Sequence, residues 1–298
     1  MRDRIAAISL VVVVGYLLLA IGSDVYGACC RSRQITPAYN RTDMNHTYQP
    51  PSWAHPLGTD FMGRDVLLRA VAGSATAMKV GVAASLLAVL IGVSLGVAAG
   101  YFGGRVDHFA LWIYSTFAAM PTLLFILAFA LLVSRGFLYA PLADALHDFS
   151  RRFHVDTGMI AVYLGIGLTG WVSLCQVVRS ETMRLREAVY VQAAKTAGHG
   201  ALHIIVRHIL PNLFHLVIIY FTMRFALAIM TEVIVSYLGL GVQLAPSWGV
   251  MIADGQERLW RGIWWEVAAA TGFMFVLVLA LNLLGDALRD ILDPKLRS

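Results

Sequence analysis

Charged residues are scarce in this chain of 298 residues. Asp, Glu, Lys and Arg together make up 14% of it, whereas 58% of the residues are hydrophobic, and the mean hydropathy is +0.70. A soluble domain has roughly 25% charged residues. The composition therefore argues against a set of soluble domains and indicates a polytopic membrane protein. In such a protein a net charge of +5 reflects basic cytoplasmic loops, so we expect no nucleic acid partner.

Lysine is nearly absent, and its positions exclude one class of ATP site. The lysines are Lys79, Lys195 and Lys295, and none of them follows a glycine. A P-loop requires a Gly-Lys step, because the lysine and the glycine-rich backbone hold the phosphates together. This chain therefore cannot bind ATP through a P-loop.

Cysteine is also rare, and the three cysteines do not suggest a disulfide framework. Cys29 and Cys30 are adjacent and poorly placed to pair with each other, and Cys175 lies in an apolar run. We expect all three to be unpaired thiols.

Groups of residues that could form a catalytic or metal-binding site are missing from the apolar runs. Acidic residues are almost confined to the polar segments, with Glu232 as the exception. His199 and His203 are four residues apart, as in some zinc sites, but no glutamate stands beside them in an HExxH pattern and no third ligand is near. We therefore expect no catalytic residues, no metal site and no cofactor.

Long apolar runs are what the sequence has in abundance, and each can cross a bilayer as a helix. They cover residues 5–23, 78–102, 109–134, 157–178, 213–238 and 263–284. The first follows Arg2 and Arg4, and a cleaved signal peptide is its alternative reading, although its length favours an uncleaved helix. Pro121 predicts a kink in the third run. The predicted fold is all-α, with six transmembrane helices in one domain.

Three segments follow from this pattern. Residues 1–26 form a first transmembrane helix with a short cytoplasmic N-terminus. Residues 27–76 form an extracytoplasmic loop, with paired acidic and basic residues and a short amphipathic helix near its end. Residues 77–298 form the core with the remaining helices. In the second run Gly92, Gly96 and Gly100 place a glycine stripe on one helix face, which predicts close packing of a neighbouring helix.

A polar, basic stretch from 190 to 212 interrupts the apolar pattern between the fourth and fifth runs. Ala193, Ala194 and Ala197 form a face of small side chains, and Gly198 can take the positive φ of a tight turn. Apolar residues then recur at helical spacing until Pro211, which we expect to end the helix. The stretch predicts a rigid helix–turn–helix that protrudes from the membrane.

This stretch resembles the EAA signature of permease subunits in binding-protein-dependent ABC importers. The family pattern is Glu-Ala-Ala, three residues, Gly, nine residues and Ile-x-Leu-Pro. The matching residues here are Gln192, Ala193, Ala194, Gly198, Leu210 and Pro211. Gln192 replaces the acid and His208 replaces the isoleucine. The resemblance implies that residues 179–212 form a cytoplasmic coupling loop that docks into an ATPase subunit.

Other blocks resemble one branch of the same family. HPLGTD-x-x-GRD at 55–65, SYLGLG at 236–241 with PSWG, and NLLGD-x-LRD-x-LDP near the C-terminus are similar to C-type subunits of oligopeptide, dipeptide and nickel permeases. The resemblance implies the type I ABC importer architecture and a location in the bacterial inner membrane with both termini cytoplasmic. Basic residues divide almost equally between the two sides, so this orientation rests on Arg2, Arg4 and the resemblance.

The resemblance also implies a function and a set of partners. The chain would form half of the translocation pathway for short peptides. It would assemble with a second homologous permease, two ATPase subunits that bind the ATP, and an extracytoplasmic solute-binding protein. An importer of nickel or another small solute, and a membrane-embedded enzyme, remain the alternatives at this point.

Arg224 and Glu232 are the two ionisable residues of the fifth run. A charge within a membrane is costly unless it faces protein or water. Eight residues separate the two, which is roughly 12 Å along a helix and too far for a direct bond. We expect Arg224 to face the pathway or a subunit interface, and Glu232 to face the pathway or brace the adjoining loop. The alternative is that each has only a packing role.

Overall fold

The structure is a computed structural model that describes residues 2–134, 144, 148, 150, 157–241 and 245–292. Within these ranges the regular elements are helices, and the β pairing is an isolated bridge between Thr59 and Asp65. The prediction of an all-α fold is confirmed. Most of the polar loop expected at 135–156, residues 242–244 and the end of the tail lie outside the described residues.

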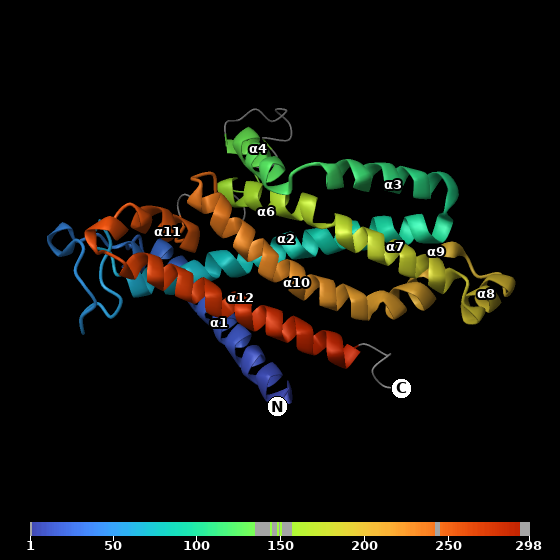
Figure 1. The fold of residues 1–298 in the computed structure, drawn as a ribbon, viewed down its shortest axis with the longest axis horizontal. Helices are drawn as coiled ribbons and strands as arrows, with labels where there is room; N and C mark the ends of the chain where they lie inside the picture. The colour runs from blue at the N-terminus through green and yellow to red at the C-terminus, as the bar shows by residue number, and fades with distance from the viewer. Residues whose placement is uncertain are drawn as a thin grey trace.

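The helices form an elongated bundle (Figure 1). Their bounds are α1 Arg2–Ser32, α2 Val66–Phe102, α3 Gly104–Ala119, α4 Thr122–Ser134, α6 Thr157–Gly170, α7 Val172–Arg186, α8 Val189–Thr196, α9 Ala201–Ile204, a π turn Ile205–Ile209, α10 Leu210–Tyr237, α11 Trp248–Gln256 and α12 Trp265–Leu292. Short 3₁₀ turns cover Ala38–Asn40, Met44–His46 and Leu259–Arg261. The loop after α1 and helix α11 lie at one end of the bundle, and α8 lies at the other.

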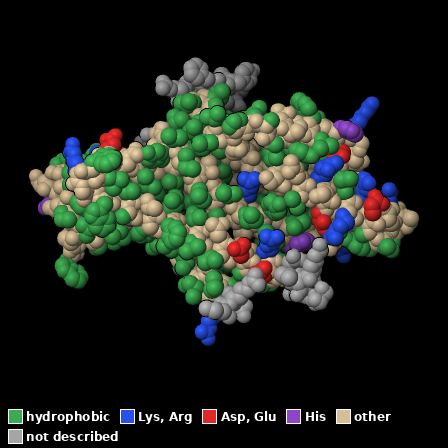
Figure 2. Space-filling model, viewed as in Figure 1, with side chains coloured by type: hydrophobic (Ala, Val, Ile, Leu, Met, Phe, Trp, Pro, Cys, Tyr) green, Lys and Arg blue, Asp and Glu red, His purple; other side chains and the backbone are tan. Residues whose placement is uncertain are grey.

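Five helices of the described part are long and apolar enough to cross a membrane. They are Arg4–Ser32, Val66–Phe102, Gly158–Arg186, Ala201–Tyr237 and Trp265–Leu292, and the bent pair α3–α4 would make a sixth span. Hydrophobic side chains cover most of the middle of the molecule, and many charged ones gather near the end that carries α8 (Figure 2). This distribution suits a polytopic protein with polar ends.

The third apolar run is broken more sharply than predicted. The sequence led us to expect a kinked helix at Pro121, but α3 and α4 meet at 90°. Met120 is extended, with φ −85° and ψ 132°, because the proline ring disfavours helical backbone in the residue before it. The kink is therefore corrected to a complete break between two helices.

The loop after the first helix is shorter than the expected segment 27–76. Helix α1 continues to Ser32 and α2 already begins at Val66. The Asp65 carboxylate caps α2 by accepting a hydrogen bond of 3.0 Å from the backbone amide of Leu68. The short amphipathic helix that we expected here is thus the first part of α2, since no glycine bend or proline interrupts the helix after Asp65.

The glycine stripe of α2 packs against α7, as the prediction of close helix packing requires. A Cβ added at Gly92, Gly96 or Gly100 would lie 3.0, 2.8 or 2.6 Å from the carbonyl oxygen of Trp171, Cys175 or Arg179, respectively. The two backbones can approach this closely only because the stripe has no side chains.

A buried carboxylate organises the loop between α1 and α2. Asp60 is fully buried, and its Oδ2 accepts hydrogen bonds from Arg64 Nε at 2.6 Å and Arg69 Nη1 at 3.0 Å. Its Oδ1 accepts from the backbone amides of Met62 and Arg64. The paired acidic and basic residues therefore form a local salt-bridge lattice, as expected.

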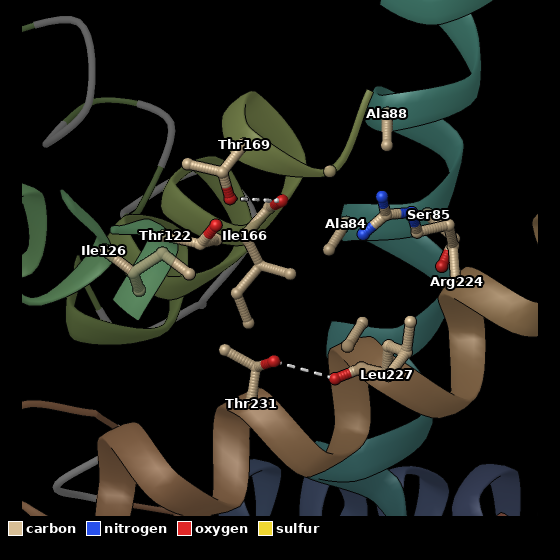
Figure 3. Close-up of a pocket in the computed structure, with 12 residues that line it drawn as sticks. Ala84, Ser85, Ala88, Thr122, Ile126, Ile166, Thr169, Arg224, Leu227 and Thr231 are labelled. Atoms are coloured by element: carbon tan, nitrogen blue, oxygen red, sulfur yellow. Dashed lines mark hydrogen bonds between the residues drawn. The ribbon is translucent and has the colours of Figure 1, made fainter. Parts of the chain in front are cut away.

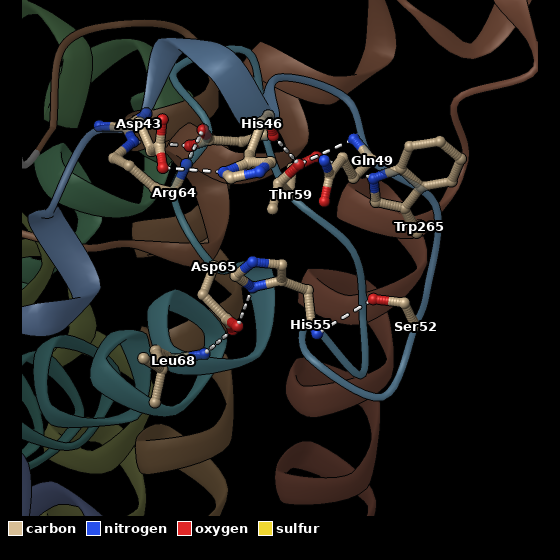
Figure 4. Close-up of polar contacts among 11 residues, drawn as sticks. Asp43, His46, Gln49, Ser52, His55, Thr59, Arg64, Asp65, Leu68 and Trp265 are labelled. Atoms are coloured by element: carbon tan, nitrogen blue, oxygen red, sulfur yellow. Dashed lines mark hydrogen bonds and ion pairs between the residues drawn. The ribbon is translucent and has the colours of Figure 1, made fainter.

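The same loop is tied to α2 and α12 (Figure 4). His55 Nδ1 lies 2.8 Å from Asp65 Oδ2 at the start of α2. The Trp265 indole donates to the carbonyl of Thr59 at 3.0 Å, and Arg258 donates to the Tyr48 hydroxyl at 2.6 Å. We call residues 33–65 together with α11 the outer cap.

Candidate functional site

A hairpin between α7 and α10 protrudes at the end of the bundle opposite the outer cap (Figure 1). It comprises α8, a tight turn, α9 and the π turn, and we call residues 187–209 the hairpin loop. Gly198 has φ +81°, and its amide donates to the carbonyl of Lys195 at 3.1 Å. The positive φ that the sequence required of this glycine is present, and the helix–turn–helix prediction is confirmed.

The hairpin loop has a buried inner face that anchors it to α7. Val191, Ala194, Ile204 and Ile209 are buried and cluster with residues of α7 such as Leu185. Burying these apolar side chains fixes the position of the loop on the helix. Movement of the loop should therefore carry α7 with it.

The outer face of the hairpin loop is apolar and exposed. Val189 is 85% exposed and Leu202 is 75% exposed, and Tyr190, Ala193 and Val206 are exposed beside them. Exposed apolar residues at the polar end of a membrane protein are typical of a docking surface. Ala193 and Gly198 are the predicted site residues that belong to this outer face.

Gln192 holds the loop to the end of α7. Its Nε2 donates a hydrogen bond of 2.9 Å to the carbonyl of Arg186, the last residue of that helix. Carbonyls at a helix C-terminus have no partner within the helix, so a side-chain donor is stabilising there. An ionised carboxylate, which the family pattern has at this position, could not donate this bond.

Pro211 does not end the helix, which corrects our prediction. Helix α10 begins at Leu210, and the span Ala201–Tyr237 is continuous through the proline. The π turn Ile205–Ile209 lies directly before it, and a widened turn gives the proline ring room against the preceding carbonyls. Leu210 is half-buried and Pro211 is exposed at the root of the hairpin loop.

Arg224 lines a small, partly open cavity between the helices (Figure 3). The cavity has a volume of about 40 Å³ and lies between α2, α4, α6 and α10. Arg224 is half-buried, and its Nη2 donates to the Ser173 hydroxyl at 3.3 Å. Among the described residues no acidic side chain lies within ion-pair distance of this guanidinium.

Glu232 lies in a different environment, two turns further along α10. It is fully buried, and its Oε1 accepts hydrogen bonds from Ser236 Oγ at 2.7 Å and Ser247 Oγ at 2.8 Å. The Ser247 hydroxyl also accepts a bond from the backbone amide of Gly249 and so caps α11. Arg224 and Glu232 are thus not brought together, and Glu232 does not line the cavity.

Several polar residues within the spans escaped the sequence analysis. Ser85 lines the cavity and is 1% exposed. Asp24 of α1 and Lys79 of α2 form an ion pair between the first two spans. A search for isolated polar residues in apolar runs would have found them, because such residues need a partner or a function.

Comparisons with known proteins identify the family of this chain. The model of the family described as binding-protein-dependent transport system inner membrane component matches residues 92–298. The oligopeptide transport system permease protein OppC of Bacillus subtilis is 32% identical over 99% of this chain and 87% of that relative. The dipeptide permease DppC of the same species is 37% identical over 86% of this chain and 74% of that relative.

A third relative broadens the range of named substrates. The glutathione transport system permease protein GsiD of Pectobacterium atrosepticum is 32% identical over 88% of this chain and 79% of its own length. The family model covers well over half of the chain, and it covers the hairpin loop, the cavity arginine and the last span together. This chain belongs to the family of inner membrane components of binding-protein-dependent transport systems.

Proposed function

We propose that the chain forms half of the translocation pathway of an ABC importer for short peptides. It is a multi-pass permease subunit rather than an enzyme, in agreement with its family and with the relatives named as transport permeases. The peptide substrate is supported by relatives named for oligopeptide, dipeptide and glutathione transport. The observation that carries the mechanism is the exposed apolar outer face of the hairpin loop.

The hairpin loop docks onto an ATPase subunit in this proposal. Ala193 and Gly198 belong to the contact surface because their small size lets a partner approach closely. Gln192 and Ala194 hold the loop in position, Gln192 through its hydrogen bond to the Arg186 carbonyl and Ala194 through its burial on the inner face. Leu210 and Pro211 form its root, where the docking movement passes into α10.

The docking movement then passes from the hairpin loop to the helices that it contacts. The loop is bonded to the end of α7, and α7 packs on the glycine stripe of α2. A rigid connection of this kind converts closure of the ATPases into tilting of helices. The stripe offers a backbone-to-backbone surface along which two arrangements of α2 and α7 can exchange.

The full assembly contains a second homologous permease, two ATPase subunits that bind ATP, and an extracytoplasmic solute-binding protein. The hairpin loop and both termini are cytoplasmic, and the outer cap faces the binding protein. This orientation is supported by Arg2 and Arg4 before the first span and by the opposite placement of cap and loop (Figure 1). The proposed segments are 1–26, 27–76 and 77–298, and the ends of α1 and α2 extend into the second of them.

The test is transport by the reconstituted complex in vesicles. The chain is co-expressed with its partner permease, ATPases and binding protein, and uptake of labelled di- and tetrapeptides is compared with uptake of Ni²⁺. We expect ATP-dependent uptake of peptides and none of the metal ion. Uptake of Ni²⁺ alone would transfer the proposal to the nickel alternative, and no ATP-dependent uptake of either would contradict it.

A further inference from the structure

The cavity beside Arg224 combines an unneutralised cation with a second unused donor. The guanidinium contacts only the Ser173 hydroxyl among the described polar groups. The Ser85 hydroxyl lies in the same cavity, is buried, and has no hydrogen-bond partner among the described residues. Buried polar groups are nearly always bonded, so an unused donor next to a free cation suggests a ligand that the chain alone does not supply.

Two other hydroxyls that line the cavity donate to carbonyls of their own helices. Thr169 donates its hydroxyl proton to a carbonyl of its own helix, Gly165 at 3.0 Å or Ile166 at 3.1 Å. Thr231 donates to the Leu227 carbonyl at 2.8 Å. The exposed Thr122 hydroxyl also lines the cavity. With it, the Arg224 guanidinium and the buried Ser85 hydroxyl supply the donors of the cavity, and together they favour an anionic acceptor.

The dimensions of the cavity fit a small group. Its 40 Å³ hold about three water-sized groups at roughly 10–15 Å³ each, which is the size of a carboxylate. Gly170 keeps this space open, because a Cβ there would lie 3.8 Å from Arg224 Nη1 and 3.2 Å from the Ala88 Cβ. Ile126 and Ile166 close the apolar side.

We infer that this cavity binds the terminal carboxylate of the transported peptide, an inference that rests on the proposed function and names a subsite within it. Guanidinium and carboxylate pair in a planar, bidentate geometry, and desolvation between helices strengthens the bond. Every peptide has a terminal carboxylate whatever its side chains are. A subsite of this kind would hold one end of many peptides and leave the side chains in the wider pathway.

The experiment compares a tripeptide with its C-terminal amide in vesicles that contain the complete importer. The wild type should take up the free acid roughly 10- to 100-fold better than the amide, the range expected for a charge-assisted hydrogen bond. Arg224→Gln should remove this preference, because it should slow uptake of the acid much more than uptake of the amide. Ser85→Ala should reduce the preference by a smaller factor.

Two further variants keep the test decisive if Arg224→Gln fails to assemble. Arg224→Lys retains the charge without the bidentate geometry, so it should assemble and show a reduced preference. Ser180→Ala removes a hydroxyl from an exposed site on α7 that bonds only to its own helix, and it should keep the wild-type preference. An unchanged preference in both Arg224→Lys and Ser85→Ala would overturn the inference.

The remaining outcomes separate the inference from the proposed function. Equal uptake of acid and amide by the wild type would overturn the subsite and leave peptide import standing. Uptake of neither would overturn the proposed function and the subsite with it. An amidated peptide with a glutamate side chain is the last arm. If it is taken up as well as the free acid and depends on Arg224, the cavity reads side-chain carboxylates and the assignment to the peptide terminus is wrong.

Discussion

Gly96 of α2 lies directly against the backbone carbonyl of Cys175 in α7, such that a Cβ on the glycine would be 2.8 Å from that oxygen. Val178 closes the other side, with its Cβ 2.9 Å from the same point. A backbone oxygen in a packed helix cannot move aside as a side chain can. The contact therefore fixes how closely α2 and α7 approach.

The first prediction concerns this contact. Gly96→Ala should destabilise the folded protein by about 1–3 kcal/mol, since overpacking must push α2 and α7 apart. The measurement is thermal unfolding of the purified protein in detergent. Gly15→Ala is the matched control, because a Cβ at Gly15 meets nothing within 4 Å, and alanine is the better helix former. Equal midpoints for Gly96→Ala and wild type would contradict the packing argument.

The second prediction concerns docking of the hairpin loop. Ala193→Glu places an unpaired charge and extra bulk on the exposed outer face, and we expect ATPase recovery on co-purification to fall by about 10-fold or more. Membrane insertion should be unchanged because Ala193 lies outside the spans. Lys195→Ala, an exposed change two residues away, should have a much smaller effect. Full recovery of the ATPases with Ala193→Glu would remove the docking role from this face.

The third prediction concerns Gln192 and is specific to its donor. Gln192→Glu replaces the amide that donates to the Arg186 carbonyl by a carboxylate near the negative end of the α7 dipole. We expect the hairpin loop to lose about 1–2 kcal/mol of anchoring, seen as faster amide hydrogen exchange in α8. Lowering the pH should partly restore protection, because a protonated carboxyl can donate. Wild-type exchange rates in this variant at neutral pH would contradict it.

The fourth prediction concerns topology. In a background without the three cysteines, single cysteines at Ala197 and Asn45 should label from opposite sides of the membrane with an impermeant reagent. Ala197 is exposed at the turn of the hairpin loop and Asn45 is exposed in the outer cap. If both positions are labelled from the same side, an even number of spans must separate them, and the six-span topology is wrong.

The fifth prediction concerns Asp254 of α11 in the outer cap. Burial raises the pKa of its carboxyl, and Arg64 and Arg258 offset this only in part. The Asp254 carboxyl therefore ionises at lower pH in the unfolded chain than in the folded one. Its ionisation begins to reduce the free energy of unfolding as the pH rises through the unfolded pKa, and the reduction is complete above the folded pKa. Asp254→Asn should raise the unfolding midpoint at neutral pH and leave it unchanged below about pH 3, where the carboxyl is protonated in both states. A constant difference across that window would contradict the assignment.

Much of the architecture follows from local patterns in the sequence. Apolar runs of sufficient length predict spans because a bilayer demands internally bonded backbone over a fixed thickness. The turn at Gly198 and the close packing along Gly92, Gly96 and Gly100 were also predictable, since both depend on the absence of a side chain at known positions. The family pattern around Gln192 is likewise contained in a short stretch of sequence and could be recognised without the structure.

Other features depended on the surroundings of each residue. Pro121 lies within an apolar run and Pro211 lies just before one. Pro121 breaks its helix completely, whereas Pro211 lies inside a continuous span. The difference lies in the extended backbone of Met120 and in the π turn before Leu210. Proline chemistry alone does not distinguish these outcomes.

Spacing along α10 alone determined that Arg224 and Glu232 do not pair, because a helix sets their separation. Only the tertiary structure decided what each of them meets. Glu232 is bonded by Ser236 and by Ser247 from a distant segment, whereas Arg224 faces a cavity to which α2, α4 and α6 contribute. Helix periodicity and hydropathy are properties of neighbouring residues in the chain. The partner of a buried charge depends on how separate helices pack against one another. Such a contact joins residues that are far apart in the chain, so a local sequence pattern does not reveal it.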